Sequence, residues 1–422
     1  MKSRLAERLP FLLLLFAVAF FPFCYGLAAG IWKFPPAETA LQSYYDARNL
    51  VLHWRNDFEL EPSRHLVESY PDRREPFRLH KPEALGEGYI LVSGLTPDEA
   101  TINGARLIDS SGKQVHYWPF DYASIHPGGP APWNVFQHGI SVLPDGSAIV
   151  NFDAGQRLAR FDACGEVIWS QQGSYHHATS LADDGTLWTL RDDALVQIDP
   201  ETGEPLSEIG LIEDLIEKQG RHDILALRSE ENAEDEFEFS HDPLHGNHVE
   251  ALPAALAAAF PMFEAGDLLF SLRNLNLVGV LDSGTKQLKW WSIGPWHRQH
   301  DPHFGADGRI LVYNNDMNFP PSEILAIDPD TRETEVLFAG SEAAPFYSYR
   351  RGKFQQLEDG RILIAESERG RVFMVDAEGE LIFEYNNRYD DTHNGVVSAA
   401  IHLPPDFFDA GALDCAAEPE AS

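Results

Sequence analysis

The sequence predicts an all-β protein, a six-bladed β-propeller, with an N-terminal transmembrane anchor helix. Two observations predict this: a hairpin-forming phrase returns six times along the chain, and a long apolar run follows three basic residues at the N-terminus. The 422 residues are 44% hydrophobic and 23% charged, which is typical of a chain that folds. One large all-β domain accommodates most of this length.

The repeated phrase consists of an apolar strand, a turn of the Asp-Gly type and a second strand. Five clear copies read LPDGSAIVNF, LADDGTLWTL, EAGDLLFSLR, GADGRILVYN and LEDGRILIAES, and a weaker first copy reads GEGYILVSG. Their turn glycines are Gly88, Gly146, Gly185, Gly266, Gly308 and Gly360. Asp-Gly turns between β-rich runs are the strongest short signal of a hairpin. Each copy is followed by a second hairpin, so the unit matches the four-stranded blade of a propeller.

The N-terminus carries Lys2, Arg4 and Arg8 ahead of an uncharged run, Leu9–Trp32, of 24 residues. A helix of that length crosses about 30 Å of hydrocarbon. We expect residues 1–35 to be a signal anchor rather than a cleaved signal peptide, for which Gly26-Leu27-Ala28 is the candidate cleavage site. The basic flank should stay in the cytoplasm, so we expect a single-pass membrane protein with its propeller on the periplasmic or extracytoplasmic side.

The rest of the chain divides into a juxtamembrane helix and linker, a propeller and an acidic tail. The predicted ranges are 36–85, with the helix at Glu38–Trp54, then 86–405 and 406–422. The gap between Gly185 and Gly266 is longer than one blade, and its extra residues are expected to form insertions on a rim. These are a short helix at Leu211–Gln219, an acidic loop at Ser229–Phe239 and an Ala-rich segment at Ala251–Phe260.

Charge and cysteine content exclude several classes of function. Lys and Arg total 32 against 66 Asp and Glu, for a formal net charge of −34, so a nucleic-acid partner is not expected. The three cysteines, Cys24, Cys164 and Cys415, have no metal-ligand spacing and allow at most one disulfide.

Histidines recur at one position of the repeat. His138, His177 and His300 each lie eight residues before a turn glycine. The strand leading into the first hairpin of a blade is the innermost one, so equal offsets place these side chains at one height around the central channel. In the fourth unit, His245 and His248 of DPLHGNHVE occupy the corresponding place.

Arg273, in the segment SLRN, belongs to the same unit and is expected to face the same channel. A metal site was one alternative, with Asp301 and Asp242 as further candidate ligands. We expect no metal there, because a guanidinium beside a cation is unfavourable whereas beside an oxyanion it forms bidentate hydrogen bonds. Histidines that merely stabilise the structure were the other alternative.

Imidazole can attack an electrophilic sulfur or phosphorus and hold the transferred group covalently, while cationic donors stabilise its oxygens. Four segments then resemble the motifs of bacterial aryl sulfotransferases, in the same order along residues 86–400: SYHHA (Ser174–Ala178), DPLHGNH (Asp242–His248), SLRN (Ser271–Asn274) and QHD (Gln299–Asp301). Members of that family are exported six-bladed propellers. They move a sulfuryl group between phenols through a sulfohistidine, without a nucleotide donor.

The resemblance implies a function and roles for individual residues. His300 is expected to be the nucleophile, Arg273 to bind sulfuryl oxygens, and His245 and His177 to bind them or to act as acid and base. The expected substrate-binding residues are His138, His176, His248 and Asn247. The implied partners are an aryl sulfate donor and a phenolic acceptor, and no cofactor is implied.

Two other functions remained open. One is a non-catalytic, ligand-binding or scaffolding propeller at the membrane surface. The other is a quinone-cofactor dehydrogenase, because the segments LDSGTKQLKWW and IDPETGEPL resemble the blade motifs of those enzymes. The presence of six units rather than eight disfavours this function. Since sulfate esters are anions, the enzyme hypothesis also predicts a positive channel built from Arg273, Arg298 and the histidines.

Overall fold

A computed structural model of the chain describes residues 4–32, 43–44, 47–48, 51, 60, 63–221 and 242–415. The chain divides into two compact units, Met1–Arg64 and His65–Ser422, which are treated separately below.

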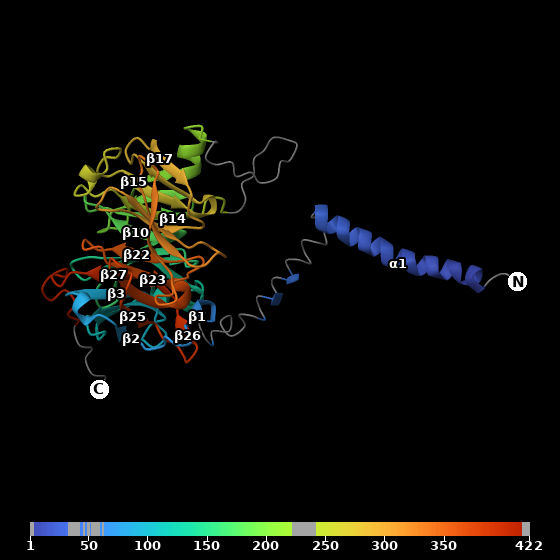
Figure 1. Ribbon diagram of the computed structural model, residues 1–422, viewed down its shortest axis with the longest axis horizontal. Helices are drawn as coiled ribbons and strands as arrows, with labels where there is room; N and C mark the ends of the chain where they lie inside the picture. The colour runs from blue at the N-terminus through green and yellow to red at the C-terminus, as the bar shows by residue number, and fades with distance from the viewer. Residues whose placement is uncertain are drawn as a thin grey trace. The chain divides into compact units, whose positions relative to one another are not determined.

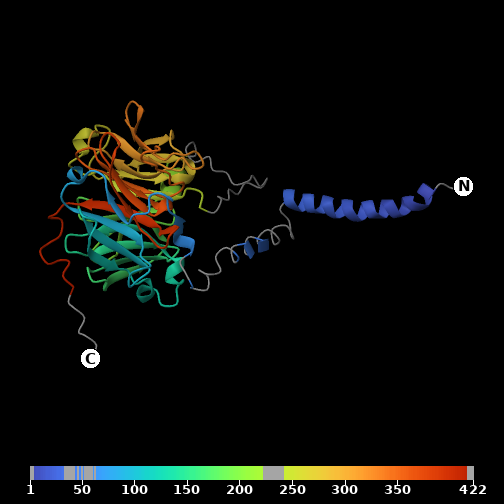
Figure 2. The same cartoon turned by 60° about the horizontal axis from the view of Figure 1, so that its bottom comes forward.

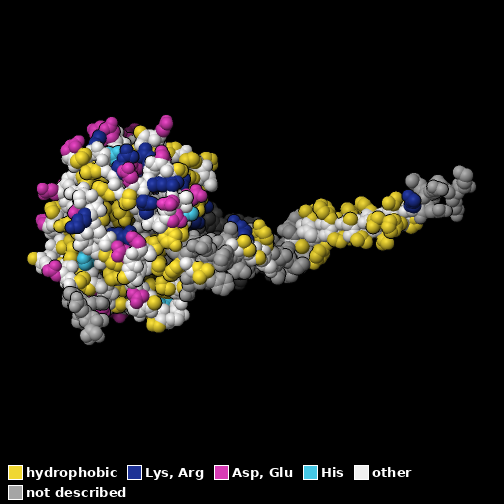
Figure 3. Space-filling view, turned by 90° about the horizontal axis from the view of Figure 1, so that it is seen from below, with side chains coloured by type: hydrophobic (Ala, Val, Ile, Leu, Met, Phe, Trp, Pro, Cys, Tyr) yellow, Lys and Arg dark blue, Asp and Glu magenta, His cyan; other side chains and the backbone are white. Residues whose placement is uncertain are grey.

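The first unit contains one long helix, α1 (Arg4–Trp32). Its stretch Arg8–Ala29 is long and apolar enough to cross a membrane, although a signal sequence has the same properties. Hydrophobic side chains cover this helix over most of its length (Figure 3). The predicted N-terminal apolar helix is therefore confirmed. Most of the predicted juxtamembrane helix, Glu38–Trp54, lies outside the described residues.

The second unit is a six-bladed β-propeller, as predicted (Figures 1 and 2). Its first three blades, written from the inner to the outer strand, are β27 (Val397–Leu403), β3 (Tyr89–Leu95), β4 (Asn103–Asp109) and β5 (Gln114–Pro119); β6 (Phe136–Val142), β7 (Ala148–Asp153), β8 (Arg157–Phe161) and β9 (Val167–Gln172); and β10 (Tyr175–Leu181), β11 (Leu187–Arg191), β12 (Ala194–Ile198) and β13 (Pro205–Gly210).

The other three blades are β14 (Gly246–Ala251), β15 (Leu268–Leu272), β16 (Leu277–Leu281) and β17 (Leu288–Ile293); β18 (His300–Phe304), β19 (Ile310–Asn314), β20 (Glu323–Ile327) and β21 (Thr334–Ala339); and β22 (Lys353–Gln356), β23 (Ile362–Glu366), β24 (Arg371–Val375), β25 (Leu381–Asn386) and β2 (Phe77–Leu79). All neighbouring strands are antiparallel, and β1 (Leu66–Glu68) pairs with β26 (His393–Gly395) outside the blades.

The hairpin turns form where the sequence predicted them. Gly146 and Gly308, for example, have φ of +83° each, a left-handed conformation that glycine adopts without steric cost. An added Cβ at either position would lie 2.4 Å from a backbone oxygen. The blades pack through Val, Ile, Leu and Phe side chains of their strands, which form several buried clusters.

The ring closes through the two ends of the propeller sequence. The last strand, β27, is the inner strand of a blade whose other strands, β3 to β5, come first in the chain. The weak first repeat at Gly88 therefore starts with the second strand of a blade. The N-terminal strands β2 and β1 also pair with β25 and β26 near the C-terminal end (Figure 1).

The insertions and the C-terminal segment lie around this ring. Leu211–Glu217 forms a short π-helix, and the Ala-rich insertion contains a 3₁₀ turn at Ala257–Ala259. The predicted acidic loop Ser229–Phe239 lies outside the described residues. Beyond β27, Cys415 forms a disulfide with Cys164 of the second blade, with a Cα–Cα distance of 5.5 Å.

Further short helices complete the second unit. They are the α-helical turn α3 (Tyr122–Ile125) and the 3₁₀ turns Ser63–His65, Pro82–Ala84, Pro132–Asn134, Arg273–Leu275 and Ser367–Arg369.

Candidate active site

The candidate site is built on irregularities of the inner strands. The antiparallel register shifts in β6, β10, β14 and β18 at the point where the predicted histidines stand. A bulge of this kind turns a side chain out of its regular alternation. His177, His245 and Asp301 have positive φ values of 61°, 50° and 47°, a conformation that costs a non-glycine residue about 1–3 kcal/mol and is common at functional sites.

Four of the other predicted site histidines lie around His177. The centroid of its ring lies 4.0 Å from that of His138, 4.9 Å from that of His245, 5.0 Å from that of His176 and 6.4 Å from that of His300. These rings come from four successive blades, so the equal spacing in the sequence does correspond to one place in the fold.

His300 has a defined tautomer and an available nitrogen. Its Nδ1 lies 2.6 Å from Oδ1 of Asn315, whose amide nitrogen donates to the carbonyls of Ser348 and Arg351 at 2.7 and 2.9 Å. Because Oδ1 of Asn315 can only accept, Nδ1 of His300 must carry the proton. Its Nε2 is buried and has no hydrogen-bond partner among the described residues.

The His300 ring is neutral near pH 7. Burial lowers its pKa well below the usual range, and the positive charge of Arg273 lowers it further. A neutral imidazole with Nδ1 protonated presents the lone pair of Nε2, which is the form required for nucleophilic attack.

His177 is fixed in a similar way by its neighbour. Nε2 of His176 donates to the backbone oxygen of Asp192 at 3.0 Å, and Nδ1 of His176 lies 2.8 Å from Nδ1 of His177. Since Nε2 of His176 is the donor to Asp192, its Nδ1 is placed to accept from Nδ1 of His177, which leaves Nε2 of His177 with its lone pair. Burial lowers the pKa of His177 well below the usual range, as do the surrounding histidines.

His245 is paired with a carboxylate. Its Nδ1 contacts Oδ2 of Asp242, whose other oxygen accepts the backbone N–H of His245 at 3.0 Å. The hydrogen bond from His245 lowers the pKa of Asp242. A carboxylate behind an imidazole fixes the orientation of the ring, so Nε2 of His245 is left to face the other histidines.

His138 completes the histidine group at 3.7 Å from Asp153 (Nδ1 to Oδ2). Burial lowers the pKa of His138 to about 4 despite this carboxylate, so the ring is neutral near pH 7.

Arg273 brings positive charge to the group. Burial and the positive charges of Arg298, Arg350 and Arg351 together lower its pKa to about 10, so four guanidinium groups share one region. Its Nε is buried without a hydrogen-bond partner among the described residues, which leaves a donor available to an anion. Lys and Arg side chains gather on part of the face in Figure 3 although the chain is strongly acidic.

Sequence reasoning missed Arg350 and Arg351, which precede β22. The signal was the pair of arginines in YRRGK, nine and ten residues before the turn glycine Gly360 and therefore near the histidine position of the repeat. It also missed Asn315, which directly follows β19 and had no motif to mark it.

The remaining two predicted residues lie beside the group. Asn247 is buried and its amide nitrogen donates to the backbone oxygen of Gln299 at 2.8 Å, so it supports the segment that carries His300. His248 instead packs against His303, with ring centroids 5.1 Å apart, and lies next to Asp301.

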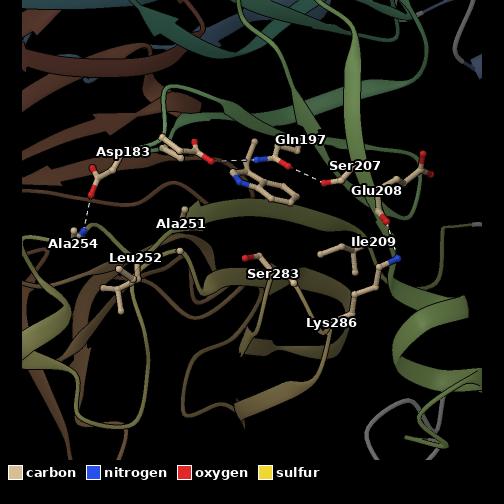
Figure 4. Close-up of a pocket in the computed structure, with 16 residues that line it drawn as sticks. Asp183, Gln197, Ser207, Glu208, Ile209, Ala251, Leu252, Ala254, Ser283 and Lys286 are labelled. Carbon is tan, nitrogen blue, oxygen red and sulfur yellow. Dashed lines mark hydrogen bonds between the residues drawn. The ribbon is translucent and has the colours of Figure 1, made fainter.

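A cavity of about 600 Å³ lies elsewhere, between the third and fourth blades (Figure 4). Its 16 described lining residues include neither histidine nor arginine. Asp183, Gln197, Ser207 and Lys286 on its walls already bond to protein groups. The histidine and arginine group is therefore the better candidate for chemistry.

Comparisons with known proteins agree with the motifs. A structure from Bacteroides caccae, described as a protein of unknown function, has 11% sequence identity and a TM-score of 0.51, covering 75% of this chain and 99% of that one. A streptogramin B lyase structure has 11% identity and a TM-score of 0.42 over 75% of this chain and 89% of that one. A virginiamycin B lyase from Staphylococcus aureus has 13% identity and a TM-score of 0.37 over 60% and 71%.

At these identities the first structure supports the fold alone, and no curated protein matches the chain. The profile of the arylsulfotransferase (ASST) family, however, matches residues 139–388, which is more than half of the chain and contains every residue of the histidine group except His138. The chain belongs to the arylsulfotransferase (ASST) family.

Proposed function

We propose that this protein moves a sulfuryl group from an aryl sulfate ester to a phenolic acceptor through a sulfohistidine at Nε2 of His300. The observation that carries the proposal is the state of that nitrogen: it is deprotonated, free of protein hydrogen bonds among the described residues, and close enough to the half-buried Arg273 for the charge of the guanidinium to lower the pKa of the ring. Membership of the family supports the substrate class.

The first half-reaction forms a nitrogen–sulfur bond. The lone pair of Nε2 on His300 attacks the sulfur of the ester, the bond from sulfur to the aryl oxygen breaks, and the aryl oxide leaves with the electron pair. His245 donates a proton to that oxide. In the second half-reaction the acceptor phenol loses its proton, its oxygen attacks the sulfur, and the nitrogen–sulfur bond breaks to restore His300.

The other residues of the site have separate roles in the proposed reaction. The guanidinium of Arg273 binds sulfuryl oxygens, whose negative charge must be stabilised throughout the transfer. A donor in that role typically lowers the activation barrier by about 3–4 kcal/mol. His177, with its free Nε2, suits the removal of the acceptor's proton. His138 and His176 complete the wall of the substrate site, and Asn247 holds the backbone before His300.

The same proposal includes a location. We infer that α1 anchors the chain in a membrane and that the propeller lies outside the cytoplasm. Basic residues precede the apolar stretch, which favours a cytoplasmic N-terminus. The disulfide between Cys164 and Cys415 also favours an oxidising compartment.

Intact-mass spectrometry of the purified full chain, after brief exposure to an activated aryl sulfate, tests the chemistry. We expect a gain of one sulfuryl group that His300→Ala abolishes. His116→Ala is the matched control, because the His116 ring lies on the outer strand of another blade and hydrogen-bonds to the backbone oxygen of Ala163. No gain from several donors by the folded protein would contradict the proposal and favour a ligand-binding propeller.

A further inference from the structure

A second group of side chains lies on the inner strands of the fourth and fifth blades. His248 and Glu250 are on β14, and His303 is on β18. One nitrogen or oxygen of each lies within 4.8 Å of the others. The sulfuryl-transfer proposal assigns no role to Glu250 or His303, so the group needs an explanation of its own.

His248 lacks hydrogen bonds. It is 4% exposed, and neither ring nitrogen forms a hydrogen bond with the described residues. Its Nε2 lies 3.6 Å from Oε2 of Glu250, and its Nδ1 lies 3.2 Å from Oδ1 of Asp301, both without hydrogen-bond geometry. A buried polar group without a partner destabilises the folded protein, so a bound species that accepts the lone pair of His248 would relieve this cost.

His303 has the arrangement of a supported ligand. Its Nδ1 lies 2.5 Å from Oε2 of Glu250, on the side of His248, while its Nε2 lies 3.0 Å from Oδ2 of Asp301. Lys353 in turn bonds to the other oxygen of Asp301 at 3.0 Å. A metal-binding histidine commonly donates its second N–H to a carboxylate that fixes the ring, and Asp301 is placed to accept that N–H.

The group has access to solvent. Glu250 and His303 line a cavity of about 460 Å³ that extends along the turn residues Gly305 and Asp307 to Glu358. An ion could enter there and complete its coordination with water. Two imidazoles and one carboxylate are the donor set of many zinc, iron and cobalt sites.

We propose that His248, Glu250 and His303 bind one divalent transition-metal ion of the Zn²⁺ class. This site is separate from the group around His300, and nothing in the sulfuryl transfer proposed above requires it. The competing occupant of the position between His303 and Glu250 is a proton, with a water molecule beside His248.

The test uses the untagged full chain in detergent, stripped with a chelator and titrated with Co²⁺, then with Zn²⁺ in competition. We expect one Co²⁺ per chain, with visible absorption bands of a nitrogen- and oxygen-bound ion that Zn²⁺ removes. Glu250→Gln and His248→Gln should each weaken Co²⁺ binding by at least about 10-fold. Glu358→Gln, an exposed carboxylate on the same cavity, is the control and should leave the affinity unchanged.

Two results would overturn the site. One is the absence of both a Co²⁺ band and stoichiometric Zn²⁺ by elemental analysis, which would favour the proton and water. The other is equal affinity in the wild type and in both ligand variants with native circular dichroism, which would place the ion elsewhere. Both readouts are independent of sulfuryl transfer, so a failure here leaves the proposed reaction untouched.

Discussion

The proton on His300 is positioned by a single amide. Asn315 accepts from Nδ1 of His300, and its own orientation is set because its nitrogen donates to two backbone carbonyls. The available Nε2 of His300 is thus a consequence of hydrogen bonds that Asn315 makes just beyond the end of β19, the strand next to β18.

Replacing Asn315 tests this positioning role. In Asn315→Ala the His300 ring can rotate and exchange tautomers, so we expect the rate of sulfohistidine formation to fall about 100-fold with little change in KM for the donor. Rapid-quench mass spectrometry measures the rate. Asn103→Ala removes an equally buried asparagine that donates to the carbonyl of Pro132 in another blade, and its rate should stay near that of the wild type. Equal losses in both variants would indicate a general loss of stability instead.

Arg273 allows charge and geometry to be separated. Arg273→Met removes the cation from the buried group, and we expect kcat/KM for an aryl sulfate to fall about 100- to 1,000-fold. Arg273→Lys keeps the charge without the planar fork and should recover part of the loss. Steady-state kinetics with one donor and one phenol measure both. If both variants matched the wild type, Arg273 would have no part in binding sulfuryl oxygens.

At the scale of residues, the sequence predicted the histidines but not their partners. His138, His177 and His300 share an offset from a turn glycine, and that offset is preserved because each blade repeats one hairpin geometry. Asn315 lies in the same blade as His300, just after β19, and no motif marks it. Arg350 and Arg351 reach the group from the next blade, and only their place before Gly360 marked them.

At the scale of elements, the bulged inner strands bury several histidines in their neutral form. Burial lowers the pKa of His138 to about 4, and those of His177 and His300 lie well below the usual 6.5. In the unfolded chain these rings regain ordinary pKa values. Between about pH 4 and 6.5 the unfolded state therefore binds more protons than the folded state, and the free energy of unfolding falls as the pH falls.

We therefore expect the melting temperature to drop between pH 7 and pH 5, before most carboxylates titrate. Each such histidine contributes about 2 kcal/mol to the loss over this interval. Differential scanning fluorimetry at several pH values measures it. His138→Gln cannot gain a proton, so its melting temperature should depend less steeply on pH than that of the wild type. An identical slope would mean that His138 is already protonated in the folded protein.

The closure of the ring could not be predicted from the same local patterns. Hairpins were recognised because both strands and their turn lie within a dozen residues. The pairing of β27 with β3, and of β2 with β25, joins segments about 300 residues apart. Local periodicity carries no information about such pairs, which is why the sequence alone predicts a juxtamembrane helix and linker for residues 36–85.

At the scale of the whole molecule, residues before the predicted propeller boundary at residue 86 pair with buried carboxylates of the propeller. Arg73 and His80 contact Glu384 at 3.1 and 2.7 Å, and Tyr70 donates to Glu366 at 2.7 Å. Both glutamates are buried beside Arg371, which alone cannot compensate two carboxylates.

A pair of truncations follows from this arrangement. A chain that starts at residue 63 retains β1, β2 and these contacts, so we expect a soluble domain that melts cooperatively, as followed by circular dichroism. A chain that starts at residue 86, at the predicted propeller boundary, loses Arg73 and His80, so that Arg371 alone must compensate both Glu366 and Glu384. Leaving a buried charge without its partner typically costs about 3–5 kcal/mol, so this shorter chain should melt at least about 6 °C lower or fail to fold. Equal melting temperatures would show instead that residues 63–85 are a linker without a structural role.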